Sequence, residues 1–390
     1  MSKLPTTPSL PQPTPEEQAV SDRLTDLIRA EIVAAGGAIP FARFMELALY
    51  APQLGYYSAG QHKFGVAGDF VTAPELGPVF AQCVARQCAQ ILRELGTGDI
   101  LEAGAGSGAL AADLLLELER LGQLPQNYLI LEISGTLRVR QEALLTNKAA
   151  HLMGRVRWLN HLPSAGWRGI VLGNELLDAM PVECFRVRAD GIASLTVDWE
   201  EDHFRWQEMP ASTAVRERIA PLDLPQDYVS EIGLAAEGWV RSVADILEQG
   251  VVLLIDYGFP HSEFYHPQRN TGTLMCHYRH RAHADPLLRV GLQDITAHVD
   301  FSAIAQAGTE TGLELLGYNS QAMFLLGCGV EEIAARTDQN DARAYLQFTN
   351  AVKKLTLPHE MGELFKVIAL GRGIDTPLAG FRLQDRRDRL

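Results

Sequence analysis

Three glycines and an acidic residue form the stretch of the sequence with the clearest chemical potential, "ILEAGAGSGAL" at 100–110. Gly104, Gly106 and Gly108 follow an apolar run typical of a strand and precede a run with helical spacing. Glycines at such a turn let the backbone approach a ligand closely, and the N–H groups of the helix start face the same space. The stretch can hold the pyrophosphate of a dinucleotide, hold S-adenosylmethionine, or form only a tight turn.

The spacing of the glycines does not separate the two cofactors. Gly104, Gly106 and Ala109 satisfy the G-x-G-x-x-G/A pattern of dinucleotide folds. Glu102 and the three glycines equally satisfy the E-x-G-x-G-x-G pattern of S-adenosylmethionine binders. Glu132, at the end of the next predicted strand, supplies an acid for ribose hydroxyls in either case.

The position of Glu102 favours S-adenosylmethionine. Dinucleotide folds usually keep an apolar residue two positions before the first glycine. A carboxylate there has an obvious partner if the ligand carries an ammonium group, as the methionine end of S-adenosylmethionine does. The glycine loop also follows long helical material, whereas many dinucleotide domains begin with it. The residues predicted to bind the cofactor are Glu102, Gly104, Ala105, Gly106, Gly108, Glu132 and Asn174.

Polar side chains also follow two later predicted strands. Asn174, Glu175 and Asp178 follow the strand at 169–172, and Asp256 ends the apolar run "VVLLID". Ligands of open α/β sheets lie beyond the carboxyl ends of the strands. We therefore predict Asn174, Glu175 and Asp178 as catalytic residues and Asp256 on the substrate side, with helix capping as the alternative role of Asp178.

An upstream loop, "GDFVTAPELG", offers three further polar residues, Asp69, Thr72 and Glu75. Thr72 and Glu75 are predicted on the substrate side. Capping of the following helix is their alternative role.

The elements that must position these residues alternate between strand and helix. Strands are predicted at 99–103, 128–133, 156–159 and 169–172, with helices at 108–121 and 135–145. Such alternation predicts a parallel sheet covered on both faces by helices. Later strands at 251–258, 313–317 and 364–371 complete about seven strands. This is the chain order of a Rossmann-like class I methyltransferase sheet, in which the last strand runs antiparallel.

The remaining segments lie outside this core. Pro and Thr predict a disordered lead-in at 1–20, followed by a helical N-terminal region with the upstream loop at 21–95. The methyltransferase core is predicted at 96–390, with insertions at about 182–225 and 259–300. Alternating residues at 184–207 predict an antiparallel hairpin, and a helix is predicted at 227–248.

Composition narrows the class of protein. The formal net charge of −14 disfavours a nucleic-acid binder, and no apolar run reaches the roughly 20 residues of a membrane span. The five cysteines are odd in number and never spaced C-x-x-C, as expected of reduced thiols in the cytoplasm. The first 20 residues lack an export or mitochondrial signal, which favours a cytoplasmic bacterial protein. His277, His280 and His283 lack the spacing of a metal site, so no metal is expected.

Seven motifs, taken together and in order, resemble the MidA family. They are "GDFVTAPELGPVF", "EAGAGSGALAADLL", "LEISGTLRVRQ", "GNELLDAMPVECF", "LLIDYG", "GTLMCHYRH" and "DITAHVDF". The family consists of S-adenosylmethionine-dependent methyltransferases related to the mitochondrial complex I assembly methyltransferase, and the resemblance runs from about 21 to the last strand. Members usually show G-P-G-x-G, where this chain has Ala105 in place of proline.

The resemblance implies methylation of an arginine in a protein partner, such as a respiratory-complex subunit or another protein with a basic segment. Acidic side chains would hold the guanidinium, with Glu175 and Asp178 as the main candidates and Glu75 as an outer contributor. A small-molecule methyltransferase, a non-catalytic assembly factor that keeps the cofactor pocket, and a dinucleotide oxidoreductase are the alternatives. The sequence leaves the oligomeric state open, with a homodimer as one option.

Overall fold

The computed structural model describes residues 10–58, 72–337 and 341–390. Asp69 of the upstream loop and the first nine residues of the predicted lead-in lie outside this part of the chain. The chain divides into two compact units. Unit 1 comprises Met1–Phe70, Ala179–Ala235 and Ser262–His298, and unit 2 comprises Val71–Asp178, Ala236–His261 and Val299–Leu390.

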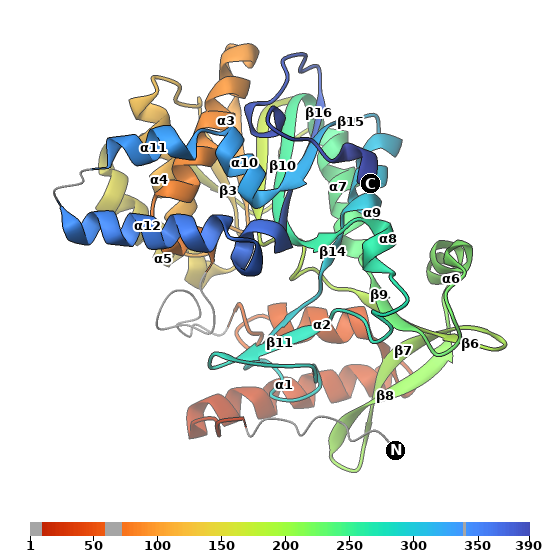
Figure 1. Cartoon of the computed structure of the whole chain (residues 1–390). Helices are drawn as coiled ribbons and strands as arrows, with labels where there is room; N and C mark the ends of the chain where they lie inside the picture. Colours follow the sequence, from red (N-terminus) through yellow and green to blue (C-terminus); the bar gives the residue numbers. More distant parts are fainter. Residues whose placement is uncertain (1–9, 59–71, 338–340) are drawn as a thin grey trace. The chain divides into compact units, whose positions relative to one another are not determined.

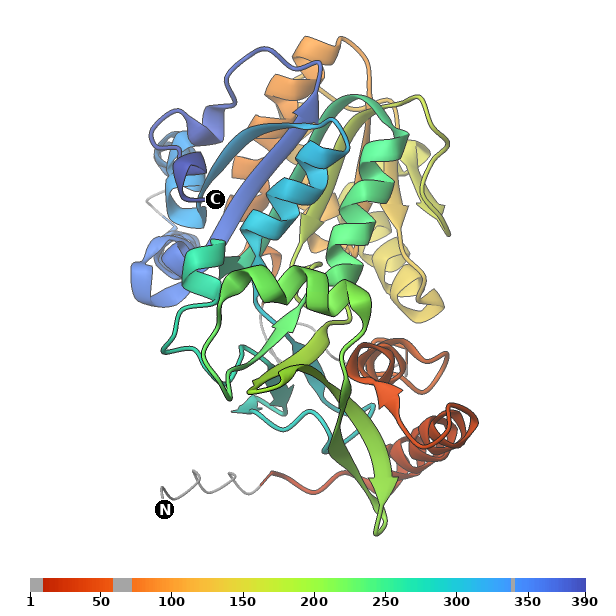
Figure 2. The same cartoon turned by 90° about the vertical axis from the view of Figure 1, so that its right-hand side faces the viewer.

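Unit 2 is built on a mixed sheet (Figures 1 and 2). In spatial order its strands are β15 (Glu314–Ser320), β16 (Phe365–Arg372), β10 (Leu247–Phe259), β5 (Trp167–Asn174), β2 (Asp99–Ala103), β3 (Tyr128–Leu131) and β4 (Val156–Leu159). The short β14 (Val299–Asp300) pairs with the end of β10. Strand β16 is antiparallel to both neighbours, and the β10–β5, β5–β2, β2–β3 and β3–β4 pairs are parallel. This order confirms the predicted class I methyltransferase sheet, with the last strand in chain order inserted antiparallel between two others.

Helices cover both faces of this sheet (Figures 1 and 2). They are α3 (Val79–Leu95), α4 (Ala109–Arg120), α5 (Gly135–Ala149), α7 (Leu234–Ile246), α9 (Phe301–Glu310), α10 (Gln321–Gly327), α11 (Val330–Arg336) and α12 (Ala342–Thr356). Short helical turns complete the unit at Ala73–Leu76, Ala150–Arg155, Pro358–Gly362, Ala379–Phe381 and Arg387–Arg389. Amphipathic spacing explains the packing of α4, since Leu110, Leu114, Leu115 and Leu118 are all buried as predicted.

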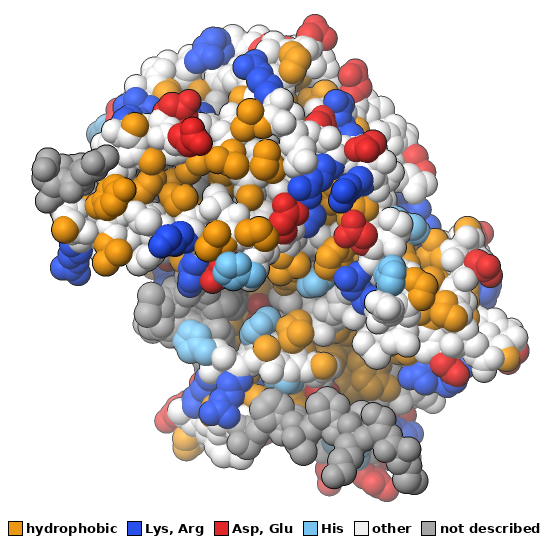
Figure 3. Space-filling view, in the orientation of Figure 1, with side chains coloured by type: hydrophobic (Ala, Val, Ile, Leu, Met, Phe, Trp, Pro, Cys, Tyr) orange, Lys and Arg blue, Asp and Glu red, His pale blue; other side chains and the backbone are white. Residues whose placement is uncertain are grey.

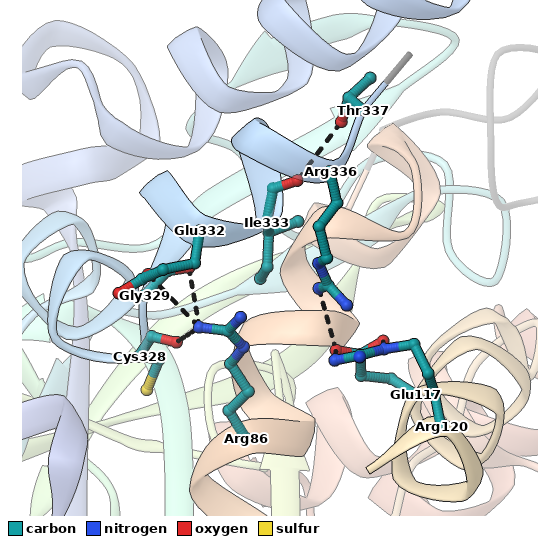
Figure 4. A network of polar contacts seen from close by, with 9 residues as sticks. All are labelled: Arg86, Glu117, Arg120, Cys328, Gly329, Glu332, Ile333, Arg336 and Thr337. Carbon is teal, nitrogen blue, oxygen red and sulfur yellow. Dashed lines mark hydrogen bonds and ion pairs between the residues drawn. The ribbon is translucent and has the colours of Figure 1, made fainter.

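Two arginine clusters connect α11 to α3 and α4 (Figure 4). Arg86 of α3 donates to the carbonyls of Cys328 (3.2 Å) and Gly329 (3.1 Å), immediately before α11. On α4, the buried Glu117 accepts two hydrogen bonds from Arg120 and one from Arg336 of α11 at 3.1 Å. These contacts satisfy a buried carboxylate with two cations and fix three helices of unit 2 to one another.

Unit 1 has its own core and two small sheets. The larger sheet has the order β1 (Ile39–Pro40), β7 (Gly191–Glu200), β6 (Glu183–Arg188), β9 (Val229–Ile232), and β8 (His203–Pro210) pairs with β7. The smaller one has the order β12 (Arg281–His283), β11 (Met275–Tyr278), β13 (Asp294–Thr296). Helices α1 (Pro15–Ala34), α2 (Phe41–Tyr50), α6 (Thr213–Ile219) and α8 (His261–Phe264) and the turn Ala220–Leu222 complete it. Its core includes Leu24, Ile28, Phe41, Phe44, Val197 and Ile295.

Three predicted boundaries differ from the structure. Helix α1 begins at Pro15, inside the predicted lead-in, because Thr14 and Glu17 form a capping box there. The predicted helix at 227–248 begins as strand β9, which pairs with β6, and only Leu234–Ile246 is helical. Helix α3, grouped above with the N-terminal region, lies in unit 2, whereas unit 1 collects the N-terminal segment and most of both insertions.

The surface of unit 2 carries apolar side chains between α11 and α12 (Figure 3). Tyr345 and Leu346 of α12 are exposed, as are Leu357 and Leu364 beyond it. No helix in the described part of the chain is long and apolar enough to cross a membrane.

Candidate cofactor and substrate site

The glycine loop joins β2 to α4 at the carboxyl edge of the unit 2 sheet. Gly104, Gly106 and Gly108 have φ values of +69°, +53° and +86°, which lie in the left-handed region that side chains disfavour. Gly108 is also the N-cap of α4. A Cβ atom on Gly108 would lie 3.2 Å from the Cα of Gln141, so α5 packs tightly against the loop. The backbone therefore requires glycine here for its conformation and for its close packing.

Glu102 lies in β2, just before the loop, and is only 3% exposed. Its Oε2 accepts a hydrogen bond of 2.7 Å from the hydroxyl of Tyr128 on the neighbouring strand β3. Burial raises the pKa of Glu102 to about 7, with a smaller contribution from the nearby charge of Glu132, while the hydrogen bond from Tyr128 opposes the rise. Glu102 therefore has a partner within the chain, the hydroxyl of Tyr128, in addition to the ammonium group predicted from the sequence.

Glu132 follows β3 and is buried beside the glycine loop. Its Oε1 accepts from the backbone N–H of Ser134 at 2.9 Å, and its Oε2 accepts from Nε2 of Gln141 at 3.1 Å. Burial raises its pKa, and both hydrogen bonds act in the opposite direction because they stabilise the ionised form. Each carboxylate oxygen keeps a lone pair beyond these bonds, as binding two ribose hydroxyls requires.

Asp256, near the carboxyl end of β10, holds the turn that follows β5. Its Oδ2 accepts from the backbone N–H groups of Leu176, Leu177 and Asp178 at 3.1, 2.9 and 3.3 Å, and its Oδ1 from that of Tyr257 at 2.9 Å. Asp256 is 1% exposed, and burial raises its pKa well above the usual range. These contacts make Asp256 a buried anchor of the backbone, which differs from the predicted contact with substrate.

The turn that Asp256 holds carries Asn174, Glu175 and Asp178. Glu175 has a φ of +50°, a conformation that costs free energy for a residue with a side chain. Its Oε1 lies 3.3 Å from Nδ2 of Asn174 and 3.4 Å from the backbone N of Ala73. Asp178 is buried and accepts a hydrogen bond of 2.7 Å from the hydroxyl of Tyr257. The turn is thus strained but fixed from several sides, as functional turns often are.

The upstream segment reaches the glycine loop through Glu75. The hydroxyl of Ser107 donates to Oε1 of Glu75, and the backbone N of Ala109 donates to the same hydroxyl at 3.3 Å. Thr72 precedes the short helix Ala73–Leu76 without capping it by its side chain, so the alternative role of Thr72 as a side-chain cap is not supported. Through Ala73 and Glu75 this segment contacts both the turn after β5 and the start of α4.

The predicted site residues therefore meet at one edge of one sheet. The residues brought together in unit 2 are Thr72, Glu75, Glu102, Gly104, Ala105, Gly106, Gly108, Glu132, Asn174, Glu175, Asp178 and Asp256. Sequence reasoning missed Ser107, Tyr128, Gln141 and Tyr257, which hold four of these carboxylates. Gln141 closes the motif "LEISGTLRVRQ", which was the available signal for it.

Two features test whether this edge fits S-adenosylmethionine. The positive φ values of the three glycines leave the loop backbone open to a ligand. The Oδ1 atom of Asn174 is buried without a hydrogen-bond donor among the described residues, so it is suited to a donor of a ligand. Both features fit the cofactor. No group of three His, Cys, Asp or Glu in the described part of the chain is arranged to hold a metal ion.

The sheet order, the glycine loop, the acid in β2 and the acid after β3 define a class I methyltransferase. Residues 83–319 match the family model described as "Putative S-adenosyl-L-methionine-dependent methyltransferase", and the chain belongs to this family. A crystal structure from Burkholderia thailandensis, bound to S-adenosyl-homocysteine, is 50% identical with a TM-score of 0.95 over 98% of this chain and 100% of that one. The cofactor is therefore S-adenosylmethionine.

Curated relatives extend the similarity to a set of mitochondrial enzymes. The Drosophila melanogaster protein arginine methyltransferase NDUFAF7 homolog is 28% identical over 94% of this chain and 89% of its own length. The Homo sapiens protein arginine methyltransferase NDUFAF7 is 27% identical over 91% of this chain and 85% of its own length. The resemblance to the MidA family, drawn above from seven motifs, is confirmed.

Proposed function

We propose that the chain transfers the methyl group of S-adenosylmethionine to an arginine side chain of a protein. The observation that carries the proposal is the similarity to enzymes named protein arginine methyltransferases along nearly the whole chain. The acidic residues at the carboxyl edge of the unit 2 sheet support it, because a guanidinium needs anionic partners.

The chemistry of arginine explains the need for those carboxylates. The guanidinium stays protonated near neutral pH, and its nitrogens are then poor nucleophiles. A carboxylate that accepts two N–H bonds aligns one nitrogen with the methyl group and stabilises the departure of its proton. The methyl group then moves in line from the cofactor's sulfur to that nitrogen, and the proton leaves the nitrogen for solvent or a carboxylate.

Glu175 is the proposed contact to the guanidinium. Its side chain is only partly buried, whereas Asp178 and Asp256 are buried, and its present hydrogen bonds of 3.3 and 3.4 Å are long. We propose that the charge of Asp178 helps to stabilise the guanidinium and that Asn174 contacts the cofactor. Thr72 and Glu75 are proposed to lie on the substrate side of the site.

A labelling experiment tests the proposal. Purified protein is incubated with S-adenosylmethionine labelled in the methyl group and a lysate of cells lacking the gene, and labelled proteins are hydrolysed to amino acids. We expect label in methylarginine. Glu175→Gln keeps the shape of the side chain but removes its charge, so we expect transfer to fall on the order of 100-fold. Glu142→Gln, an exposed change on α5, serves as the matched control and is expected to leave transfer unchanged.

Other outcomes separate the alternatives. Label in lysine, or only in small molecules, would show that the methyl acceptor is not a protein arginine. Binding of S-adenosyl-homocysteine without any transfer would indicate an assembly factor. Full activity of Glu175→Gln would show that this carboxylate does not hold the acceptor.

A further inference from the structure

The amide of Gln141 connects the two parts of the cofactor site. Gln141 lies on α5 and is fully buried. Its Nε2 donates to the carbonyl of Gly106, at 3.1 Å, and to Oε2 of Glu132, also at 3.1 Å. Its Oε1 accepts from the indole Nε1 of Trp158, on strand β4, at 2.9 Å. One side chain thus contacts the glycine loop, the acid after β3 and the edge strand.

The three partners fix the orientation of this amide. The indole N–H of Trp158 can only donate, and the carbonyl of Gly106 and an ionised Glu132 can only accept. Both amide hydrogens are used, and a rotated amide would direct its oxygen at two acceptors. Such an arrangement would be costly in a buried site. Trp158 therefore selects the orientation in which Gln141 holds Glu132.

Two other contacts of Glu132 come from the residues that follow it in the chain. The N–H of Ser134 holds Oε1, and Nε of Arg138 donates to the backbone carbonyl of Glu132 at 2.7 Å. The side chain of Gln141 contacts both Glu132 and the glycine loop. The close approach of α5 to Gly108 allows this, because a Cβ atom on Gly108 would lie 3.2 Å from the Cα of Gln141.

We propose that Gln141 is a positioning residue that aligns the carboxylate of Glu132 with the ribose hydroxyls of S-adenosylmethionine, and that Trp158 fixes it in that role. The proposal rests on Glu132 as the ribose-binding acid. Gln141 acts through Glu132 and touches no reacting atom. A carboxylate held by two donors keeps its remaining lone pairs at fixed positions, so the site discriminates for both hydroxyls of the ribose.

The test measures discrimination rather than affinity alone. Calorimetry compares S-adenosyl-homocysteine with its 2′-deoxy and 3′-deoxy analogues, each of which lacks one hydroxyl. Gln141→Met keeps the length of the side chain but removes both donors and the acceptor. We expect this variant to bind S-adenosyl-homocysteine about 10-fold more weakly and to bind the deoxy analogues almost as the wild type does. The ratio of the two affinities, which measures discrimination for the hydroxyls, should therefore fall about 10-fold. Gln126→Met, at an exposed position, is the matched control.

A second variant guards against a loss of folding. Trp158→Phe leaves Gln141 in place but removes the donor that orients its amide, and we expect discrimination to fall about threefold. Equal weakening of S-adenosyl-homocysteine and its deoxy analogues in both variants would overturn the proposal, because that is the result of a purely structural role.

Glu132→Gln separates this proposal from the assignment on which it rests. If Glu132→Gln removes discrimination while Gln141→Met and Trp158→Phe keep it, Glu132 binds ribose without the help of Gln141, and the proposal is wrong. If Glu132→Gln itself retains discrimination, the ribose assignment fails and the proposal fails with it.

Discussion

Glu102 and Glu117 are two carboxylates of unit 2 that are buried almost equally, at 3% and 4% exposure. Glu117 contacts Arg120 and Arg336 (Figure 4), whereas Glu102 contacts the neutral hydroxyl of Tyr128. Burial acts to raise the pKa of both. The arginines outweigh it and lower the pKa of Glu117, and the single hydroxyl does not, so the pKa of Glu102 rises to about 7.

The difference shows how one residue type serves two purposes. A buried carboxylate paired with cations is satisfied within the chain and contributes to the stability of the folded state. A buried carboxylate with only a neutral partner lowers the stability of the folded state when it is ionised. A cationic ligand that binds beside it stabilises the ionised form. The first kind connects α4 to α11, and the second lies beside the glycine loop. Substitutions at each can break or sharpen this comparison.

The largest effect is expected from Glu102→Gln. If Glu102 faces the ammonium group of the cofactor, the variant should bind S-adenosyl-homocysteine on the order of 100-fold more weakly, a change of about 3 kcal/mol. Binding of 5′-methylthioadenosine, which has no amino-acid end, should not change. Calorimetry with both ligands measures the difference.

The same pair of ligands gives a pH signature. Binding an ammonium group requires ionised Glu102, so affinity of the wild type should fall as the pH drops through about 7, and this dependence should vanish in Glu102→Gln. Without ligand the sign reverses: the raised pKa makes the wild type lose stability as the pH rises from about 4.5 to about 7. A variant that loses affinity for both ligands equally would contradict the assignment.

Glu117→Gln should reduce stability and leave binding intact. We expect the free energy of unfolding to fall by about 2 kcal/mol at pH 7, less than for a fully buried pair because both arginines are partly exposed. The lowered pKa of Glu117 contributes stability that is present above its unfolded-state pKa and is lost as the pH falls through the folded one. The difference between variant and wild type in urea unfolding should therefore shrink below about pH 4.

Glu119→Gln is the matched control for Glu117, because Glu119 lies on the same helix and is exposed in its contact with His151. It should change the free energy of unfolding by less than about 0.5 kcal/mol. Equal changes in the free energy of unfolding at the two positions would show that burial of Glu117 does not make its ion pairs stronger than the exposed pair of Glu119.

The smallest effect is expected from Tyr128→Phe. The variant removes the donor that favours ionised Glu102, so the pKa of Glu102 should rise further and the pH dependence of S-adenosyl-homocysteine binding should move to higher pH. Affinity at pH 7 should fall about fivefold, or about 1 kcal/mol, and should approach that of the wild type near pH 9. Tyr345→Phe, on the exposed surface of α12, is the control. An unchanged pH profile would show that the hydroxyl does not act on Glu102.

Much of the unit 2 sheet could be predicted because its signals are local. The strands predicted at 99–103 and 156–159 have the observed bounds, and the apolar run ending in Asp256 lies in the middle of the sheet. The grouping of the N-terminal segment with both insertions in unit 1 could not be predicted, because it depends on contacts between distant segments that no periodicity records. Strand β9 was predicted as helix for the same reason, since pairing with β6 overrides its local propensity.

The sequence by itself determined the alternation of strands and helices with which the unit 2 sheet begins, the glycine loop and the set of acids near the ends of the strands, because spacing and residue type encode them. Only the tertiary structure decided what each acid does. Burial, and the partner that a distant segment brings, set the protonation of a carboxylate, and neither can be read from its neighbours in the chain. Three buried carboxylates therefore have three different roles because their partners differ. Glu102 contacts the hydroxyl of Tyr128, Glu117 contacts Arg336, and Asp256 accepts from four backbone N–H groups.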